Sequence, residues 1–193
     1  MKAFFSVSSR TKIDKDYLVD ARYISDSIAK MGHDLVIGVA MNEGMPGEVL
    51  KSFKDNNRKI NLKTLKVYGE NPNEFNYVDF DYYDDTFERT KAIYDESDFL
   101  ILMPGGTGTT AEIMAFLEQA RTDSWDNKIP KTIIIYNKDG HYNNLFLAVG
   151  DYIYKRFNDE SIYEYLNIFT NKDELIDFVG RQFNDDSVKE NIK

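Results

Sequence analysis

The segment spanning residues 98–121 constrains the fold of this chain more than any other stretch of the sequence. Residues 99–103 form an uninterrupted apolar run that ends at Pro104, and such a run is typical of a strand buried on both faces of a parallel sheet. Glycines follow directly, at Gly105, Gly106 and Gly108. Apolar residues then recur at helical spacing, at Ile113, Met114, Phe116 and Leu117. The segment therefore predicts a strand, a glycine loop and a helix, in that order.

The predicted glycine loop has the form of an anion site. Glycine lets the backbone approach a ligand without an intervening Cβ, and the first N–H groups of a helix have no partner within the helix. An anion, and above all a phosphate, is the expected occupant of such a loop. We therefore predict that a ligand phosphate binds at Gly105, Gly106, Thr107, Gly108 and Thr109.

Two other interpretations of these residues stay open. The stretch from Thr109 to Glu112 has the pattern of a capping box, in which both side chains bond to N–H groups at the start of a helix. The residues Gly106-x-Gly108-x-x-Ala111 also match the fingerprint of dinucleotide-binding folds. That fingerprint normally opens a nucleotide-binding half, whereas here about a hundred residues precede it. We therefore expect no nicotinamide or flavin cofactor.

Apolar runs alternate with helical repeats along the whole chain. This alternation predicts a single α/β domain over residues 1–183, with a Rossmann-like, doubly wound parallel sheet and helices on both faces. The predicted strands are residues 3–7, 34–38, 62–68, 99–103, 131–136 and 166–169. The predicted helices are residues 14–31, 48–53, 86–95, 142–157 and 171–183, together with the helix that follows the glycine loop to residue 121. Residues 184–193 are polar and are expected to fray.

Residues 69–85 interrupt this regular pattern. The stretch is acidic and aromatic, and it contains a proline and asparagine turn signals. Two interpretations stay open for it. It forms a flap over a ligand site, or it is a solvated connection whose tyrosines pack on the edge of the sheet.

Composition argues against several classes of function. A net charge of −9 argues against nucleic acid or an anionic membrane as the main partner, because both attract basic surfaces. The chain has no cysteine, which excludes disulfides, thiolate catalysis and zinc–thiolate sites. The two histidines, His33 and His141, lack metal-ligand spacing, so we interpret both as surface or turn residues and expect no metal. The N-terminal apolar stretch is too short for a signal peptide and no run approaches membrane-spanning length, so we expect a cytoplasmic protein.

Three predicted loops are candidates to surround a ligand. Ligands of open α/β sheets bind beyond the carboxyl ends of the strands, near the point where the strand order reverses. The loops expected there are the turn at Ser8 and Ser9, the stretch from Gly38 to Gly47, and the glycine loop. We therefore expect a single site formed by these three loops.

The sequence PGGTGTTAE at residues 104–112 resembles the PGGxGTxxE motif of the lonely-guy (LOG) phosphoribohydrolases, which are often labelled lysine decarboxylases. The resemblance covers essentially the whole chain, including residues 4–9, the first helix and residues 137–142. It implies a Rossmann-like domain that usually forms a homodimer. It also implies hydrolysis of the N-glycosidic bond of a nucleoside 5′-monophosphate, which releases a free base and ribose 5-phosphate.

The resemblance assigns roles to individual residues. The family's catalytic glutamate falls on Glu112 and its catalytic arginine on Arg89. Its phosphate loop falls on the glycine loop, residues 105–109. We expect the remaining substrate contacts at Ser8, Ser9, Gly38, Gly44 and Lys91.

The chain departs from the family pattern near these residues. A Gly-Gly-Gly stretch of the family is replaced by Gly38-Val39-Ala40, and a methionine by Thr86. The lysine expected directly after the arginine is displaced by one position, to Lys91. These changes lie around the base and ribose rather than around the phosphate.

Glutamate and arginine suit the implied reaction. Cleavage of an N-glycosidic bond passes through a positively charged, oxocarbenium-like sugar, which a nearby carboxylate stabilises while it orients or deprotonates water. A guanidinium offsets the repulsion between that carboxylate and a bound phosphate. We therefore predict a hydrolase that acts on a purine nucleoside monophosphate such as AMP. The alternatives are a non-catalytic nucleotide-binding or sensor protein of the same fold and a ribosyl transferase.

Overall fold

A parallel sheet of seven strands forms the centre of the molecule. The computed structural model describes residues 1–68, 75–158 and 160–183, so the predicted frayed tail at 184–193 and residues 69–74 of the predicted flap lie outside the described residues. The strands are β1 (Lys2–Ser6), β2 (Asp34–Ile37), β3 (Ile60–Leu65), β4 (Asp79–Tyr83), β5 (Phe99–Leu102), β6 (Thr132–Tyr136) and β7 (Leu166–Phe169). Their order across the sheet is β4-β3-β2-β1-β5-β6-β7, and all pairs are parallel.

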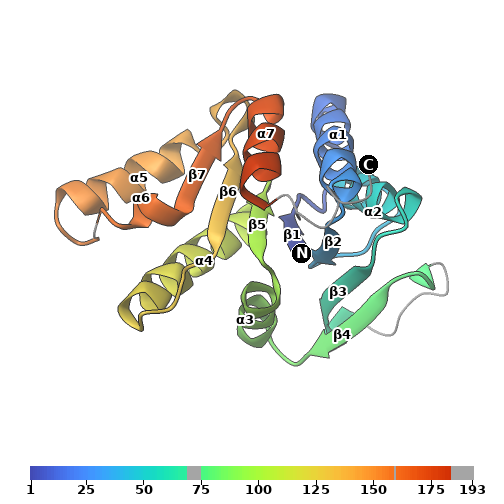
Figure 1. The fold of residues 1–193 in the computed structure, drawn as a ribbon, viewed down its shortest axis with the longest axis horizontal. Coiled ribbons are helices and arrows are strands. Elements are labelled where there is room, and N and C mark those ends of the chain that lie inside the picture. Colours follow the sequence, from blue (N-terminus) through green and yellow to red (C-terminus); the bar gives the residue numbers. More distant parts are fainter. Residues whose placement is uncertain (69–74, 159, 184–193) are drawn as a thin grey trace, which may run out of the picture.

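Helices cover both faces of this sheet (Figure 1). They are α1 (Lys15–Lys30), α2 (Gly44–Asp55), α3 (Thr86–Glu96), α4 (Thr107–Trp125), α5 (Asn143–Tyr154), α6 (Ile162–Tyr165) and α7 (Lys172–Phe183), with 3-10 turns η1 (Lys66–Tyr68) and η3 (Lys138–Gly140). Because side chains alternate along a strand, Phe5 packs in the core beneath α1, α2 and α7, whereas Phe4 packs beneath α3, α4 and α5. The predicted fold class, a doubly wound α/β domain, is confirmed. None of the described helices combines the length and apolarity needed to cross a membrane.

The strand order reverses between β1 and β5. Strands β2, β3 and β4 add in sequence on one side of β1, and β5, β6 and β7 on the other. In the pairing register, Phe4 of β1 lies opposite Val36 of β2 and Leu100 of β5. The loops that follow β1 and β5 therefore leave the sheet side by side, at the crevice where this class of fold binds ligands.

The prediction that residues 69–85 are irregular is wrong for residues 79–83. These residues form β4, which pairs with β3 at the edge of the sheet. Aspartates alternate with aromatic residues along this strand, and none of its residues is fully buried. An edge strand of this kind lacks the apolar run that marks a central strand, and aspartate is unfavourable in strands.

Two further expectations are wrong. Helix α2 begins at Gly44, so it contains the second half of the predicted loop from Gly38 to Gly47. Its proline, Pro46, lies in the first turn, where a missing backbone N–H costs no helical hydrogen bond. His33, interpreted from sequence as a surface or turn residue, is fully buried, with its ring 5.1 Å from the ring of Phe99.

Candidate functional site

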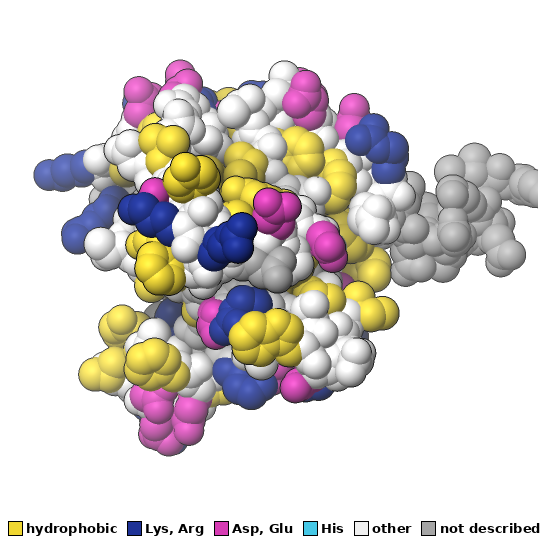
Figure 2. Space-filling view, turned by 90° about the vertical axis from the view of Figure 1, so that its left-hand side faces the viewer, with side chains coloured by type: hydrophobic (Ala, Val, Ile, Leu, Met, Phe, Trp, Pro, Cys, Tyr) yellow, Lys and Arg dark blue, Asp and Glu magenta, His cyan; other side chains and the backbone are white. Residues whose placement is uncertain are grey.

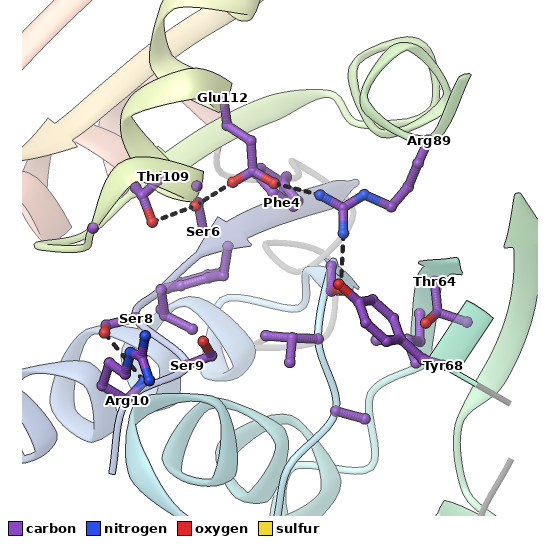
Figure 3. Close-up of a pocket in the computed structure, with 18 of the residues that line it drawn as sticks. Phe4, Ser6, Ser8, Ser9, Arg10, Thr64, Tyr68, Arg89, Thr109 and Glu112 are labelled. Carbon is purple, nitrogen blue, oxygen red and sulfur yellow. Dashed lines mark hydrogen bonds and ion pairs between the residues drawn. The ribbon is translucent and has the colours of Figure 1, made fainter. Parts of the chain in front are cut away.

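A pocket of about 780 Å³ opens at the carboxyl edge of the sheet, above the point where the strand order reverses. Its walls come from β1 and the following loop, from residues 38–40 after β2, from β3, η1 and β4, and from the facing sides of α3 and α4. Figure 3 shows Glu112 and Arg89 pointing toward each other, with Thr109 on the side of Glu112 and Thr64 and Tyr68 on the side of Arg89. The site therefore combines loops from both halves of the sheet.

Glu112 points into the pocket from the second turn of α4 (Figure 3). Its Oε2 accepts a hydrogen bond from the hydroxyl of Ser6 at 2.5 Å, and its Oε1 lies 3.2 Å from Nη2 of Arg89. Only 13% of the side chain is exposed. Burial raises the pKa of Glu112 above its ordinary value, and it outweighs the hydrogen bond from Ser6 and the charge of Arg89, which lower it. A carboxyl group that lies in a pocket, is held in place by hydrogen bonds and has a raised pKa is typical of catalytic acids and bases.

The capping-box interpretation of Glu112 is wrong. Helix α4 begins at Thr107, and its N-cap residue, Gly106, makes no side-chain capping bond. Glu112 thus lies more than one turn inside the helix, where its carboxylate bonds to Ser6 and Arg89 instead of to helix N–H groups. Thr109 is also buried, with its hydroxyl 3.3 Å from that of Ser6.

Arg89 reaches the pocket from the first half of α3. Asp85 caps this helix by accepting hydrogen bonds from two backbone N–H groups of its first turn. The guanidinium pairs with Glu112, and its Nη1 lies 3.5 Å from the carbonyl oxygen of Gly38. Its Nε is buried without a hydrogen-bond partner among the described residues. Buried donors are normally hydrogen-bonded, and this N–H is one of the exceptions within the described part of the chain.

The start of α4 supplies backbone donors to the same pocket. The first hydrogen bond of the helix runs from the N–H of Thr110 to the oxygen of Gly106 at 3.0 Å. The N–H groups of residues 107–109 therefore lie ahead of the helical hydrogen-bond ladder, and all three residues line the pocket. The dipole of this 19-residue helix favours negative charge at the same end.

The structure brings together most of the residues that the sequence predicts for the site, but not all of them. Those that line the pocket are Glu112, Arg89, Ser8, Ser9, Gly38, Gly106, Thr107, Gly108 and Thr109. Three others do not line it. Lys91 is exposed and pairs with Asp95 one turn along α3 at 2.5 Å, Gly44 begins α2, and Gly105 packs against the side chain of Thr109.

Sequence reasoning missed several residues of the pocket, above all Ser6, Arg10, Thr64 and Tyr68. The sequence does contain an indication that Ser6 belongs to the site, because Ser6 is the polar residue at the carboxyl end of a strand whose immediately preceding residues are apolar. The charged residues of the described lining are Arg10, Arg89 and Glu112, which is two positive charges against one negative charge. The pocket is therefore locally positive in a chain of net charge −9, and this balance favours an anionic ligand.

A family model described as possible lysine decarboxylase matches residues 22–179 of the chain. The chain belongs to this LOG-like family. A comparison with curated protein sequences found no match. Within the described residues of this LOG-like protein, no three His, Asp or Glu side chains are grouped to hold a metal ion.

Solved structures of other proteins have the same fold. The molybdenum cofactor carrier protein of Chlamydomonas reinhardtii is 15% identical, with a TM-score of 0.68 over 93% of this chain and 96% of that chain. The molybdenum cofactor binding protein of the phototrophic bacterium Rippkaea orientalis is 17% identical, with a TM-score of 0.61 over 93% and 94%. DNA processing protein A of Helicobacter pylori is 12% identical, with a TM-score of 0.55 over 94% and 80%. At these identities the likeness shows the fold alone, so the ligand of the LOG-like protein has to be inferred from its site.

Two alanine substitutions in the glycine loop should distinguish a glycine that is needed for packing from a glycine that is needed for ligand binding. A Cβ on Gly105 would lie 2.2 Å from Oγ1 of Thr109, so Gly105→Ala should lower the free energy of unfolding by about 1–3 kcal/mol. A Cβ on Gly108 meets no atom within 4 Å. Gly108→Ala, inside the first turn of α4, should therefore raise stability by up to about 1 kcal/mol while it obstructs an anion at the helix start. Urea unfolding and AMP titration measure the two effects, and unchanged AMP affinity in Gly108→Ala would mean that no anion approaches there.

The raised pKa of Glu112 predicts a pH dependence of stability. Burial favours the protonated carboxyl, so the folded-state pKa lies above that of the unfolded chain. The stability contributed by Glu112 is thus fully present below the unfolded pKa and is lost as pH rises through the folded pKa. Glutamine imitates the neutral form of Glu112. The Glu112→Gln variant should therefore melt at the same temperature as wild type in acid, and at a higher temperature than wild type near neutral pH. Thermal melting between about pH 4 and pH 8 tests this, and a difference that is constant with pH would contradict it.

Proposed function

We propose that this LOG-like protein hydrolyses the N-glycosidic bond of a nucleoside 5′-monophosphate to a free base and ribose 5-phosphate. The observation that carries the proposal is the buried Glu112 carboxyl, held by Ser6 and Arg89 in the same pocket as the start of α4. A binding site needs the anion-binding loop, but it has no need of a desolvated carboxyl beside that loop.

The arrangement of the pocket suits a nucleotide laid across it. The phosphate would bind the N–H groups at the start of α4, near Ser8 and Arg10. Thr109 and Glu112 are three residues apart, about 4.5 Å along the helix axis, which is similar to the span of a ribose ring. The sugar would then lie beside Glu112, and the base would lie toward Thr64 and Tyr68 on the far side of the pocket. An aromatic side chain at that end is suited to stack on a planar base.

The residues of the pocket support a simple reaction sequence. As the bond between C1′ and the base nitrogen breaks, its electron pair leaves with the base, and the sugar becomes an oxocarbenium-like cation. The ionised Glu112 stabilises this cation and takes a proton from the attacking water, whose oxygen forms the new bond to C1′. The departing base nitrogen takes up a proton from solvent, and Glu112 then releases its proton to solvent. Arg89 and Ser6 hold the carboxylate in place and favour its charged form.

Product analysis tests the hydrolase proposal. Purified protein incubated with each nucleoside monophosphate should release free base and ribose 5-phosphate in equal amounts, as measured by chromatography. The same reaction with a second free base added separates hydrolysis from ribosyl transfer, because a transferase would make a new nucleotide. If no base is released from any nucleoside monophosphate, the hydrolase proposal is rejected.

A non-catalytic binding protein is the second candidate. Two features favour it: the structural neighbours that carry or bind molybdenum cofactor, and the replacement of the family's Gly-Gly-Gly stretch at Gly38-Val39-Ala40. In that case the pocket would retain AMP or another phosphate-bearing ligand unchanged. A crystal soaked with AMP distinguishes the candidates, because it shows whether the glycosidic bond is intact.

We further propose that the protein forms a homodimer. Trp125, at the end of α4, and Leu147, Tyr154 and Phe157, on and just after α5, are 69%, 71%, 86% and 78% exposed. Figure 2 views this side of the molecule and shows hydrophobic side chains spread among lysines and arginines. Several large, exposed apolar side chains on one side of a molecule are typical of an interface between subunits. Sedimentation at micromolar concentration should give the mass of two chains, and the mass of one chain would contradict the proposal.

A further inference from the structure

We propose that His141 is a positioning residue that directs the backbone N–H of Gly106 into the anion site. This proposal depends on one part of the proposed function, namely that the glycine loop binds the phosphate of the ligand. It concerns a residue that lies outside the pocket and that was interpreted from sequence as a surface or turn residue.

His141 holds the glycine loop from a different part of the sheet. It follows η3, in the connection between β6 and α5, and its Nε2 lies 2.8 Å from the carbonyl oxygen of Gly105. A carbonyl oxygen only accepts hydrogen bonds, so Nε2 carries a proton and donates it. The next residue, Tyr142, donates its hydroxyl to the carbonyl oxygen of Met103 at 2.8 Å. Two backbone carbonyls between β5 and α4, those of Met103 and Gly105, are therefore held by consecutive residues of one segment.

Hydrogen bonds stabilise the segment that carries His141, residues 137–143. The side chain of Asn137 is buried, and its Oδ1 accepts the backbone N–H of Tyr142 at 2.7 Å. Its Nδ2 donates to Oδ1 of Asn143 at 2.9 Å. The ring of His141 packs edge-on against the ring of Tyr142, with 4.6 Å between centroids. The imidazole is exposed, but its anchored segment and its contact with the ring of Tyr142 orient it toward Gly105, as a positioning group needs.

Peptide geometry connects the His141 contact to the pocket. In a trans peptide the C=O and the following N–H point in opposite directions, and the described chain has no cis peptide bonds. When His141 holds the oxygen of Gly105, the N–H of Gly106 points away from His141, and Gly106 lines the pocket. Glycines on both sides leave this peptide unusually free to rotate. His141 therefore restrains the peptide between Gly105 and Gly106, whose rotation no side chain of these two residues limits.

The test compares ligands with and without a phosphate. His141→Ala should weaken the binding of AMP and ribose 5-phosphate by about tenfold, the effect of losing one hydrogen bond to a charged group, and should leave adenosine affinity unchanged. His141→Gln retains an N–H donor and should restore AMP affinity to within about threefold of wild type. Asn144→Ala, an exposed position in the first turn of α5, is the matched control and should bind as wild type does.

Nuclear magnetic resonance gives a readout that does not depend on catalysis. Inorganic phosphate should shift the amide signal of Gly106 in wild type and in His141→Gln, and should shift it much less in His141→Ala. Equal losses of AMP and adenosine affinity would assign His141 a merely structural role and overturn the inference, as would a Gly106 signal that phosphate leaves unmoved. If the Gly106 signal responds as expected but AMP is never cleaved, the positioning role stands and the hydrolase proposal fails.

Discussion

Glu112→Gln should reduce the turnover of a nucleoside monophosphate by about 100-fold or more, while the protein stays folded. The amide keeps the shape of the side chain and can still accept the hydrogen bond from Ser6, but it has no charge to stabilise an oxocarbenium-like sugar and cannot take a proton from water. Release of free base from AMP, followed over time, measures the effect. Circular dichroism and thermal melting verify that the fold is retained.

The same helix provides the control for this experiment. Glu118 lies on α4, is largely exposed and pairs with Arg121 on the surface. Glu118→Gln makes the same chemical change outside the pocket, and exposed ion pairs contribute little, so activity should stay within about twofold of wild type. If Glu112→Gln retains full activity, Glu112 has no catalytic role and the hydrolase mechanism is wrong.

Arg89→Gln should lower kcat/KM by about 100-fold, whereas Lys91→Gln should leave it nearly unchanged. Both changes remove one positive charge from α3, and the two positions are two residues apart. Arg89 contacts Glu112 inside the pocket, whereas Lys91 pairs with Asp95 on the surface. Loss of the guanidinium should also raise the pKa of Glu112 further and so shift the acid limb of the pH–rate profile to higher pH. Steady-state kinetics on the two variants at several pH values measures both effects.

This pair of variants also tests the assignment of Lys91 by resemblance. The displaced family lysine suggests that Lys91 contacts the substrate, but the helical rotation between positions 89 and 91 directs the two side chains to different faces of α3. A large loss of activity in Lys91→Gln would show that the substrate reaches beyond the pocket to Lys91. Equal losses in the two variants would mean that overall positive charge on α3, rather than the contact with Glu112, matters.

Local pattern was enough to predict the elements nearest the site. The apolar run at 99–103, the glycines after it and the helical repeat that follows correspond to β5, the glycine loop and α4. The predicted strand at residues 166–169 coincides with β7. The prediction of β5 succeeded because a central strand of a parallel sheet is buried on both faces, so its residues form a continuous apolar run. The edge strand β4 has no such run, and it was missed.

Glu112 and Arg89 were placed in the site by resemblance, and the structure adds the contacts between them. Ser6 and Glu112 are 106 positions apart in sequence, and Arg89 and Glu112 are 23 apart. No local pattern relates residues at such separations, because their proximity follows from the order of strands across the sheet.

The sequence by itself determined the α/β class, the strand–loop–helix unit and the residue types available for catalysis, because these follow from apolar periodicity and turn chemistry along a short stretch of chain. Only the tertiary structure decided which polar residues share one pocket. It placed Ser6 and Arg10 in the pocket, left Lys91 on the surface, and brought His141 against the glycine loop. The physical reason is that parallel strands bring their carboxyl ends to one edge of the sheet, so residues that are distant along the chain meet there.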